Sequence, residues 1–315
     1  MWQNLLQEII NGNQKSLARC ISLVENEYAG YFEFLQQLPP SNTPVIGITG
    51  PPGAGKSTLV DALINSLVND NKKIGIICVD PSSPFNLGAV LGDRIRMSNW
   101  YNHPNVFIRS LATRGSLGGL HPKIIEITDV MKIALFDFII VETVGVGQSE
   151  IEIAGLADVT IVVLVPEAGD EVQTMKAGLM EIADMFVVNK ADRPDANAFV
   201  NNLKMMLAPA FHHQQKEIKI IKTVATKKEG IAEIIGFIYD EKKINNELND
   251  IKETRNEKQQ VRNEKKNWLL TEKAFQLIQQ SKMKNISKLV LKNEIEITAA
   301  NKGFNLYQYI KKYIN

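Results

Sequence analysis

The chain has 315 residues, of which 44% are hydrophobic and 23% are charged, and its formal net charge is +1. This composition supplies enough apolar side chains for a large globular core. A nearly neutral chain has no general electrostatic attraction for nucleic acid or for an anionic membrane, so we expect neither as a partner. The two cysteines, Cys20 and Cys78, stand in apolar runs and are expected to be buried thiols in a reducing compartment.

The N-terminal stretch predicts helices rather than an export signal. It lacks the basic start and the continuous apolar core of a secretory signal, and no apolar run approaches the roughly 20 residues needed to cross a bilayer. We therefore expect a cytoplasmic protein. Apolar residues recur at near-helical spacing from Trp2 to Gln37, and Gly12 interrupts them, which predicts two helices joined by a tight link.

From Val45 onward, short runs rich in valine and isoleucine alternate with longer mixed stretches. Continuous rather than alternating hydrophobicity is typical of strands buried on both faces of a parallel sheet. We therefore expect an α/β fold with a mostly parallel, doubly wound sheet over residues 43–240. An N-terminal helical segment, 1–42, would precede it, and a helical region, 241–315, with a charged start would follow it. The predicted strands are Val45–Thr49, Ile74–Val79, Val106–Ser110, Phe138–Glu142, Val159–Val165, Met185–Asn189 and Ile218–Val224.

A phosphate-binding loop follows the first predicted strand. Residues 50–57 read Gly-Pro-Pro-Gly-Ala-Gly-Lys-Ser, which satisfies G-x-x-x-x-G-K-[ST], and a helical pattern follows. Glycines let successive backbone N–H groups point at phosphate oxygens, and the helix directs its positive end at them. We expect Lys56 to reach the β- and γ-phosphates and the Ser57 hydroxyl to bind Mg²⁺. The predicted nucleotide contacts here are Gly50, Gly53, Ala54, Gly55, Lys56, Ser57 and Thr58.

A second motif indicates which base is bound. Residues 189–192 read Asn-Lys-Ala-Asp and directly follow a predicted strand. A buried Asp192 carboxylate could accept from guanine N1–H and N2–H₂, whereas adenine lacks that pair of donors. Asn189 would tie the base region to the phosphate loop, and the stem of Lys190 would cover the purine. Thr223 and Ala225 follow the last predicted strand, where a backbone contact to guanine O6 is expected.

Acidic residues at two strand ends predict the metal site. Glu142 ends a buried strand, with Gly145 three residues later, in the place where most G-proteins have D-x-x-G. Glu142 could reach Mg²⁺ directly or through water, and Gly145 would let its N–H approach the γ-phosphate. Asp80 ends another strand and is a second candidate ligand. Asp93, in the glycine- and proline-rich stretch after it, fits a third metal carboxylate or a helix cap equally well.

Other polar residues give weaker signals. Arg114, in a second glycine-rich stretch, fits a contact to phosphate or to a partner as well as it fits a surface salt bridge. The four histidines, His103, His121, His212 and His213, have no metal-binding spacing with cysteine and are interpreted as surface or loop residues.

Taken together, these motifs resemble the MeaB/ArgK family of G-proteins, which includes the human MMAA protein. The string Glu-Thr-Val-Gly-Val-Gly-Gln-Ser-Glu at residues 142–150 is specific to that family. The sequence departs from the family pattern at Glu167, where a glycine is expected, and it matches the family only loosely after about Asp240. The matching stretches are residues 16–25, 47–58, 79–83, 91–94, 96–97, 108–120, 141–150, 166–173 and 183–192.

The family resemblance implies a function and a partner. It implies a GTPase that acts as chaperone of an adenosylcobalamin-dependent acyl-CoA mutase, with methylmalonyl-CoA mutase or a close relative as partner and a C-terminal arm for homodimerisation. GTP hydrolysis would gate cofactor transfer and protect the mutase. The resemblance also implies that Asp80, Asp93 and Glu142 surround Mg²⁺. The loop Gly169–Gly178, with Asp170, Gln173 and Lys176, would couple hydrolysis to the mutase.

Two other functions remain as alternatives. A nucleotide-dependent transport kinase would need a base and a pocket for the acceptor, and the sequence indicates neither. A metal-insertion G-protein of the nickel-chaperone type usually carries histidine- or cysteine-rich tracts. For hydrolysis of GTP to GDP, we expect Lys56, Asp93, Glu142 and Lys176 to serve catalysis and Gln148 to be the nearest candidate for positioning water. Intrinsic turnover should be slow.

Overall fold

A computed structural model describes residues 1–81, 97–114, 120–145, 152–168, 177–211, 218–246, 253–282, 292–295 and 297. Contacts divide the chain into two units, Met1–Lys266 and Asn267–Asn315. The first unit holds the sheet and the candidate site, and the second holds the end of a long charged helix, α12 (Glu253–Lys282). Among the helices of these ranges, none is both long and apolar enough to cross a membrane.

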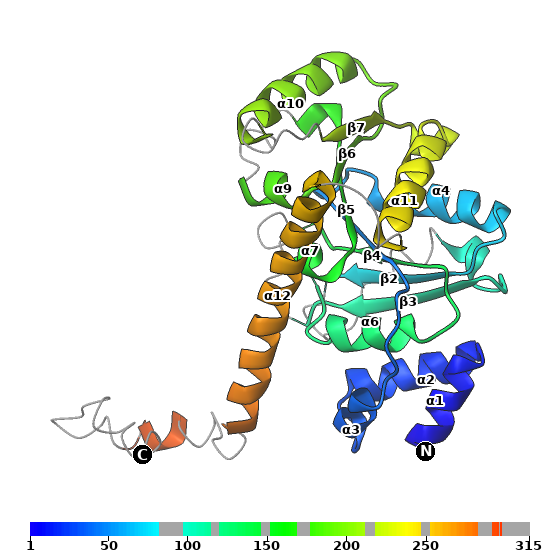
Figure 1. The fold of residues 1–315 in the computed structure, drawn as a ribbon, viewed down its shortest axis with the longest axis vertical. Helices are drawn as coiled ribbons and strands as arrows, with labels where there is room; N and C mark the ends of the chain where they lie inside the picture. The colour runs from blue at the N-terminus through cyan, green and yellow to red at the C-terminus, as the bar shows by residue number, and fades with distance from the viewer. Residues whose placement is uncertain are drawn as a thin grey trace. The chain divides into compact units, whose positions relative to one another are not determined.

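A seven-stranded sheet forms the centre of the first unit (Figure 1). Its order is β3-β2-β4-β1-β5-β6-β7, and all of the strand pairs are parallel. This confirms the predicted doubly wound fold, and each strand falls within two residues of its predicted bounds. The strands are β1 (Val45–Thr49), β2 (Ile74–Asp80), β3 (Val106–Ala112), β4 (Phe138–Glu142), β5 (Val159–Leu164), β6 (Met185–Val188) and β7 (Lys219–Lys222).

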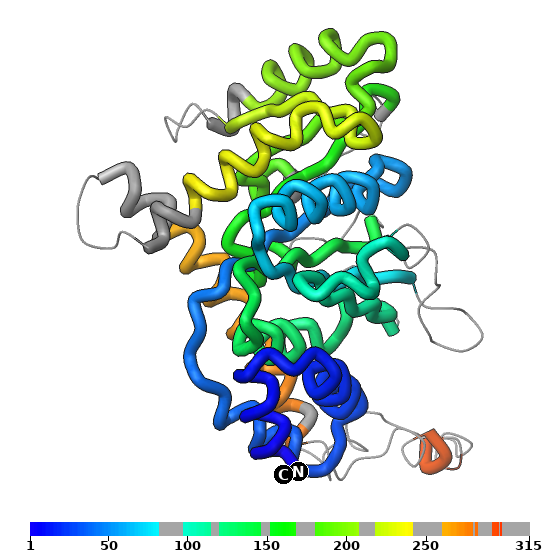
Figure 2. The backbone as a smooth tube through the Cα atoms, turned by 90° about the vertical axis from the view of Figure 1, so that its right-hand side faces the viewer, coloured from blue at the N-terminus to red at the C-terminus, as the bar shows by residue number. Residues whose placement is uncertain are grey.

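Helices cover both faces of the sheet because both faces are apolar. On one face, α4 (Lys56–Asn69) and α11 (Ile231–Asn246) lie side by side (Figure 2) and pack with Ile46 and Ile48 of β1 in one core. On the other face, α6 (Ile124–Lys132) and α7 (Glu152–Leu156) share a second core with the N-terminal helices. A third core joins α10 (Ala196–Phe211) to β5 and β6, while α9 (Ala177–Ile182) precedes β6.

The N-terminal segment forms three helices, α1 (Trp2–Ile10), α2 (Gln14–Glu25) and α3 (Tyr31–Gln36), rather than the two expected. Gly12, in the left-handed region at φ 83°, makes the predicted link between the first two. The prediction missed a second left-handed glycine, Gly30, which precedes α3 and allows the chain to turn there. Short 3₁₀ turns, η1 (Ser98–Trp100), η2 (Pro166–Ala168) and η3 (Ala225–Lys227), complete the unit.

Candidate functional site: a phosphate loop beside a base-recognition loop

The glycines of residues 50–55 give the loop between β1 and α4 its shape. Gly50, Gly53 and Gly55 have φ values of 138°, 78° and 87°, where other residues are strained. A Cβ at Gly50 would strike the carbonyl oxygen of Val163, and one at Gly55 would strike the side-chain amide of Asn189. The backbone therefore approaches its neighbours closely at both ends of the loop, and only glycine fits there.

Lys56 begins α4, and its ammonium group lies inside this loop. The side chain is buried, and Nζ donates to the carbonyl oxygens of Gly50 at 2.8 Å and of Pro51 at 3.1 Å. Gly145, at φ 88°, lies so close that a Cβ there would strike Nζ. The structure thus brings together Lys56 and Gly145, both of which the sequence predicts to approach the γ-phosphate.

Three oxygen-bearing side chains line the same cleft as Lys56. Ser57 is at the start of α4, Asp80 ends β2 and Glu142 ends β4, and each is at most 5% exposed. The Ser57 hydroxyl donates to Glu142 Oε1 at 2.7 Å. A hydroxyl and two carboxylates form an all-oxygen donor set, which suits Mg²⁺. Asp93, the other predicted ligand, lies outside the described residues.

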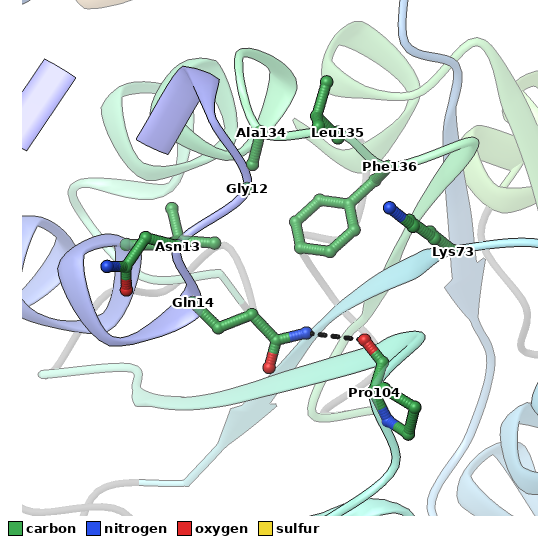
Figure 3. A pocket seen from close by; sticks show the side chains of 9 residues that line it. Gly12, Asn13, Gln14, Lys73, Pro104, Ala134, Leu135 and Phe136 are labelled. Carbon is green, nitrogen blue, oxygen red and sulfur yellow. Dashed lines mark hydrogen bonds between the residues drawn. The ribbon is translucent and has the colours of Figure 1, made fainter. Parts of the chain in front are cut away.

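These groups line a cleft of about 470 Å³ at the carboxyl ends of the strands. Its lining includes Gly53, Gly55, Lys56, Ser57, Thr58, Asp80, Glu142 and Lys190. Ligands of open parallel sheets bind at this edge. A second hollow, between the α1–α2 link and Phe136, has a volume of only about 40 Å³. Within its lining, Gln14 Nε2 donates a hydrogen bond to the Pro104 carbonyl at 3.1 Å (Figure 3). The larger cleft is therefore the candidate site for a nucleotide.

Asn189, which the sequence predicts to tie the base region to the phosphate loop, contacts the glycine loop of residues 50–55. Its buried side chain donates from Nδ2 to the carbonyl oxygen of Ala54 at 3.0 Å. Its Oδ1 accepts from the Thr223 hydroxyl at 3.1 Å and from the Ala225 N–H at 3.2 Å. One amide thus holds together three segments of the site that are far apart in the sequence.

Two further motif residues, Lys190 and Asp192, differ in how far they are exposed. Lys190 has φ 56°, and its Nζ donates to the Gly53 carbonyl at 2.8 Å, so its stem crosses the mouth of the loop. Asp192 is not buried as expected: its side chain is 45% exposed, and its Oδ2 lies 3.4 Å from Lys227 Nζ. The reason is that Asp192 stands on a turn that begins beyond the end of β6. The contact with Lys227 was not predicted, because no local sequence pattern links two residues that lie 35 positions apart.

Three arginines form ion pairs outside the cleft. Arg114, for which the sequence allowed two interpretations, pairs with Glu25 of α2 at 2.9 Å, and Arg109 of β3 pairs with the same carboxylate at 2.7 Å. Arg193 pairs with Glu167, the residue that departs from the family pattern, and this contact holds the pKa of Glu167 below its usual value. Lys176, Gln148, Asp170 and Gln173 lie outside the described residues.

The fold and this site define a P-loop nucleotide hydrolase: a parallel sheet, a glycine loop, a buried lysine at a helix start and strand-end carboxylates. The model of the family "methylmalonyl Co-A mutase-associated GTPase MeaB" matches residues 17–285, and the chain belongs to this family of GTPases.

Similar proteins agree with this assignment. A candidate GTPase of Pyrococcus abyssi is 44% identical over 260 residues, which cover 81% of this chain and 80% of that protein. The GTPase ArgK of Escherichia coli is 36% identical over 246 residues, which cover 75% of this chain and 74% of ArgK. The solved structure of an LAO/AO transport system kinase superposes with a TM-score of 0.67 at 26% identity and covers 99% of this chain and 96% of that one.

Proposed function

We propose that this GTPase is the chaperone of an adenosylcobalamin-dependent acyl-CoA mutase of the methylmalonyl-CoA mutase type. The observation that carries the proposal is the match of residues 17–285 to a family described as mutase-associated. GTP hydrolysis would gate loading of the cofactor and protect the mutase. The protein would act as a homodimer held by residues 241–315, with residues 43–240 as its G-domain and 1–42 as its N-terminal helical part.

In this proposal, GTP binds with its phosphates in the loop of residues 50–58 and its base beside residues 189–192. The Lys56 ammonium, which bonds to two loop carbonyls, would turn to the β- and γ-phosphates and neutralise the charge that develops there. Gly145 would offer its N–H to the γ-phosphate. Asp192 would accept from guanine N1–H and N2–H₂, with Asn189, Thr223 and Ala225 holding the loop in place.

Ser57, Asp80 and Glu142, with Asp93, would hold Mg²⁺. When bound, Mg²⁺ supplies positive charge beside the β- and γ-phosphates. The Ser57–Glu142 hydrogen bond of 2.7 Å fixes two of these ligands relative to each other before the metal binds. Such a preformed arrangement reduces the ordering needed on binding.

Hydrolysis requires that a water molecule attack the γ-phosphate in line. Among the described residues that line the cleft, none is a glutamine that could position this water. We therefore expect slow intrinsic turnover, with the mutase ordering the loop Gly169–Gly178 and bringing Lys176 into use. Closure of a loop by a partner is a common way to complete a catalytic site.

GTP turnover should be measured with and without a purified adenosylcobalamin-dependent methylmalonyl-CoA mutase from the same source. We expect the mutase to stimulate GTP turnover at least roughly tenfold. This factor corresponds to about 1.4 kcal/mol of added transition-state stabilisation. Lys56→Ala with the same mutase is the control, since any turnover that it retains comes from a contaminant. Unchanged turnover together with no complex on gel filtration would exclude the chaperone function while leaving the GTPase assignment intact.

A second candidate is a transport-type kinase, because a similar solved structure carries the name of an LAO/AO transport system kinase. A kinase moves the γ-phosphoryl group to an acceptor, whereas a GTPase releases it as phosphate. Incubation with GTP labelled at the γ-phosphate separates the two functions. Label on a protein or small molecule would support the kinase, and label only in inorganic phosphate would exclude it.

A further inference from the structure

Two buried threonines connect the start of the phosphate loop to the strand that ends in Glu142. Thr49 ends β1, and Thr143 directly follows β4. The Thr143 hydroxyl donates to the Thr49 hydroxyl oxygen at 3.0 Å, and Thr143 also lines the nucleotide cleft. Both residues are at most 1% exposed, so water does not compete for this hydrogen bond. A buried polar contact therefore joins two parts of the site that lie 94 residues apart in the chain.

Thr49 is a fixed point in this contact. It ends β1 near the middle of the sheet, and it pairs with Val162 of β5. The next residue, Gly50, begins the phosphate loop, and its carbonyl oxygen accepts from Lys56 Nζ at 2.8 Å. The sheet therefore holds Thr49 in place immediately before the phosphate loop begins.

Thr143 lies between two residues to which the proposed function gives a role at the γ-phosphate end of the nucleotide. Glu142 precedes it, and Gly145 follows two residues later. The Thr143 N–H donates to the Ile48 carbonyl at 3.0 Å, so Thr143 is bonded to β1 through its backbone and its side chain. At Gly145 the backbone is left-handed, and a Cβ there would come within 2.8 Å of the Gly50 carbonyl oxygen. The place of Gly145 beside the phosphate loop therefore depends on how Thr143 is held.

We infer that Thr143 is a positioning residue, whose hydrogen bond to Thr49 holds the Gly145 N–H where it can bind the γ-phosphate. The inference rests on the proposed contact of Gly145 with that phosphate. GDP has no γ-phosphate, so loss of the hydrogen bond should weaken binding of a guanosine triphosphate and leave binding of GDP unchanged. A hydroxyl that only stabilises the fold would lower the Tm without changing the relative affinity for the two nucleotides.

The test measures two dissociation constants for each variant, one for GDP and one for guanosine β,γ-imidotriphosphate, which keeps the γ-phosphate and resists hydrolysis. Thr143→Val replaces the hydroxyl by a methyl group of similar shape. It should weaken binding of the triphosphate about tenfold, as expected for one hydrogen bond to a charged group, and change GDP binding less than about twofold. Thr143→Ser keeps the hydroxyl and should bind both nucleotides like wild type. Thr128→Val is the matched control, because it removes a fully buried hydroxyl from α6.

A double variant separates positioning from stability. Thr143→Val leaves the buried Thr49 oxygen without its donor, which should lower the Tm. Combining Thr49→Val with Thr143→Val removes both hydroxyls, and replacing both partners by apolar groups of the same shape is nearly neutral for stability. The double variant should therefore recover the Tm of wild type, while its binding of the triphosphate stays about tenfold weaker.

Unchanged binding of the triphosphate in Thr143→Val would overturn the inference, and so would equal weakening of both nucleotides. Normal binding of the triphosphate in the double variant would also overturn it, because the single variant would then act only through an unpaired hydroxyl. Gly145→Ala separates these results from failure of the proposed function. If Gly145→Ala weakens binding of the triphosphate and Thr143→Val does not, the γ-phosphate contact stands and only the role of Thr143 is excluded. If neither variant changes the ratio of the two dissociation constants, the contact of Gly145 fails, and the role of Thr143 is excluded with it.

Discussion

The Ser57 hydroxyl donates a 2.7 Å hydrogen bond to the Glu142 carboxylate, although 85 residues separate them in the chain. The contact exists because β1 and β4 are neighbours in the sheet, with Ile48 paired to Glu142. The first turn of α4 therefore stands beside the end of β4. This arrangement places a hydroxyl and a carboxylate where the proposed Mg²⁺ site requires them.

Glu142→Gln should impair GTP hydrolysis more than nucleotide binding. The amide keeps the size of the side chain but loses the negative charge that favours Mg²⁺. We expect turnover to fall about 100-fold and the Mg²⁺ concentration for half-maximal turnover to rise, as measured by phosphate release across a Mg²⁺ titration. The exposed Glu233→Gln in α11 should behave like wild type. An unchanged Mg²⁺ titration in Glu142→Gln would remove this residue from the metal site.

Gly145→Ala should weaken GTP binding by roughly tenfold. Its backbone is left-handed at φ 88°, and the new methyl group would strike Lys56 Nζ and come within 2.8 Å of the Gly50 carbonyl oxygen. The strain should also lower stability by about 1 kcal/mol. Gly236→Ala is the control, because that Cβ would meet nothing within 4 Å and alanine favours a helix. Equal GTP affinity for the two variants, measured by calorimetry, would contradict the crowding at Lys56.

Asp192→Asn should change which base is preferred. An amide cannot accept from both N1–H and N2–H₂, so GDP binding should weaken about 100-fold, the range for two hydrogen bonds to a charged group. Xanthine carries a carbonyl in place of the 2-amino group, and the new amide can donate to it. The affinity for xanthosine diphosphate (XDP) should therefore increase. Competition binding of GDP against XDP measures the reversal. The exposed Asp195→Asn in the same loop should keep the preference of wild type, and retained GDP selectivity in Asp192→Asn would place guanine elsewhere.

Because of Lys265, the free energy of unfolding should depend on pH in the alkaline range. Its Nζ donates to the Glu181 and Ile182 carbonyls at the end of α9, and burial lowers the pKa of Lys265 below 10.5. Between the lowered pKa and 10.5, the unfolded chain holds this proton and the folded chain has lost it, so stability rises with pH. Relative to Lys265→Met, wild type should therefore gain stability as pH rises toward 10.5.

Urea unfolding of wild type and Lys265→Met at about pH 7 and about pH 10 measures this difference. The exposed neighbouring Lys266→Met is the control and should follow wild type at both values. A difference between wild type and Lys265→Met that stays constant or shrinks with pH would contradict a lowered pKa at Lys265.

Local chemistry made the fold and the shape of the glycine loop predictable. The valine- and isoleucine-rich runs predicted all seven strands, because residues buried on both faces leave a continuous apolar pattern. Glycine spacing predicted the loop, whose left-handed φ values no other residue adopts easily. The helix at Tyr31–Gln36 was missed because six residues are too few to show a period.

By itself, the sequence determined the class of protein, since the phosphate loop, the Asn-Lys-Ala-Asp motif and the family string are all local patterns. Only the tertiary structure decided which side chains touch. In the structure, Asn189 is hydrogen-bonded to Ala54 and to Ala225. Asp192 is partly exposed to solvent and forms an ion pair with Lys227. These contacts depend on the order of strands in the sheet, which brings the ends of distant segments together. The spacing of residues along the chain does not predict which of these segments are neighbours in the fold.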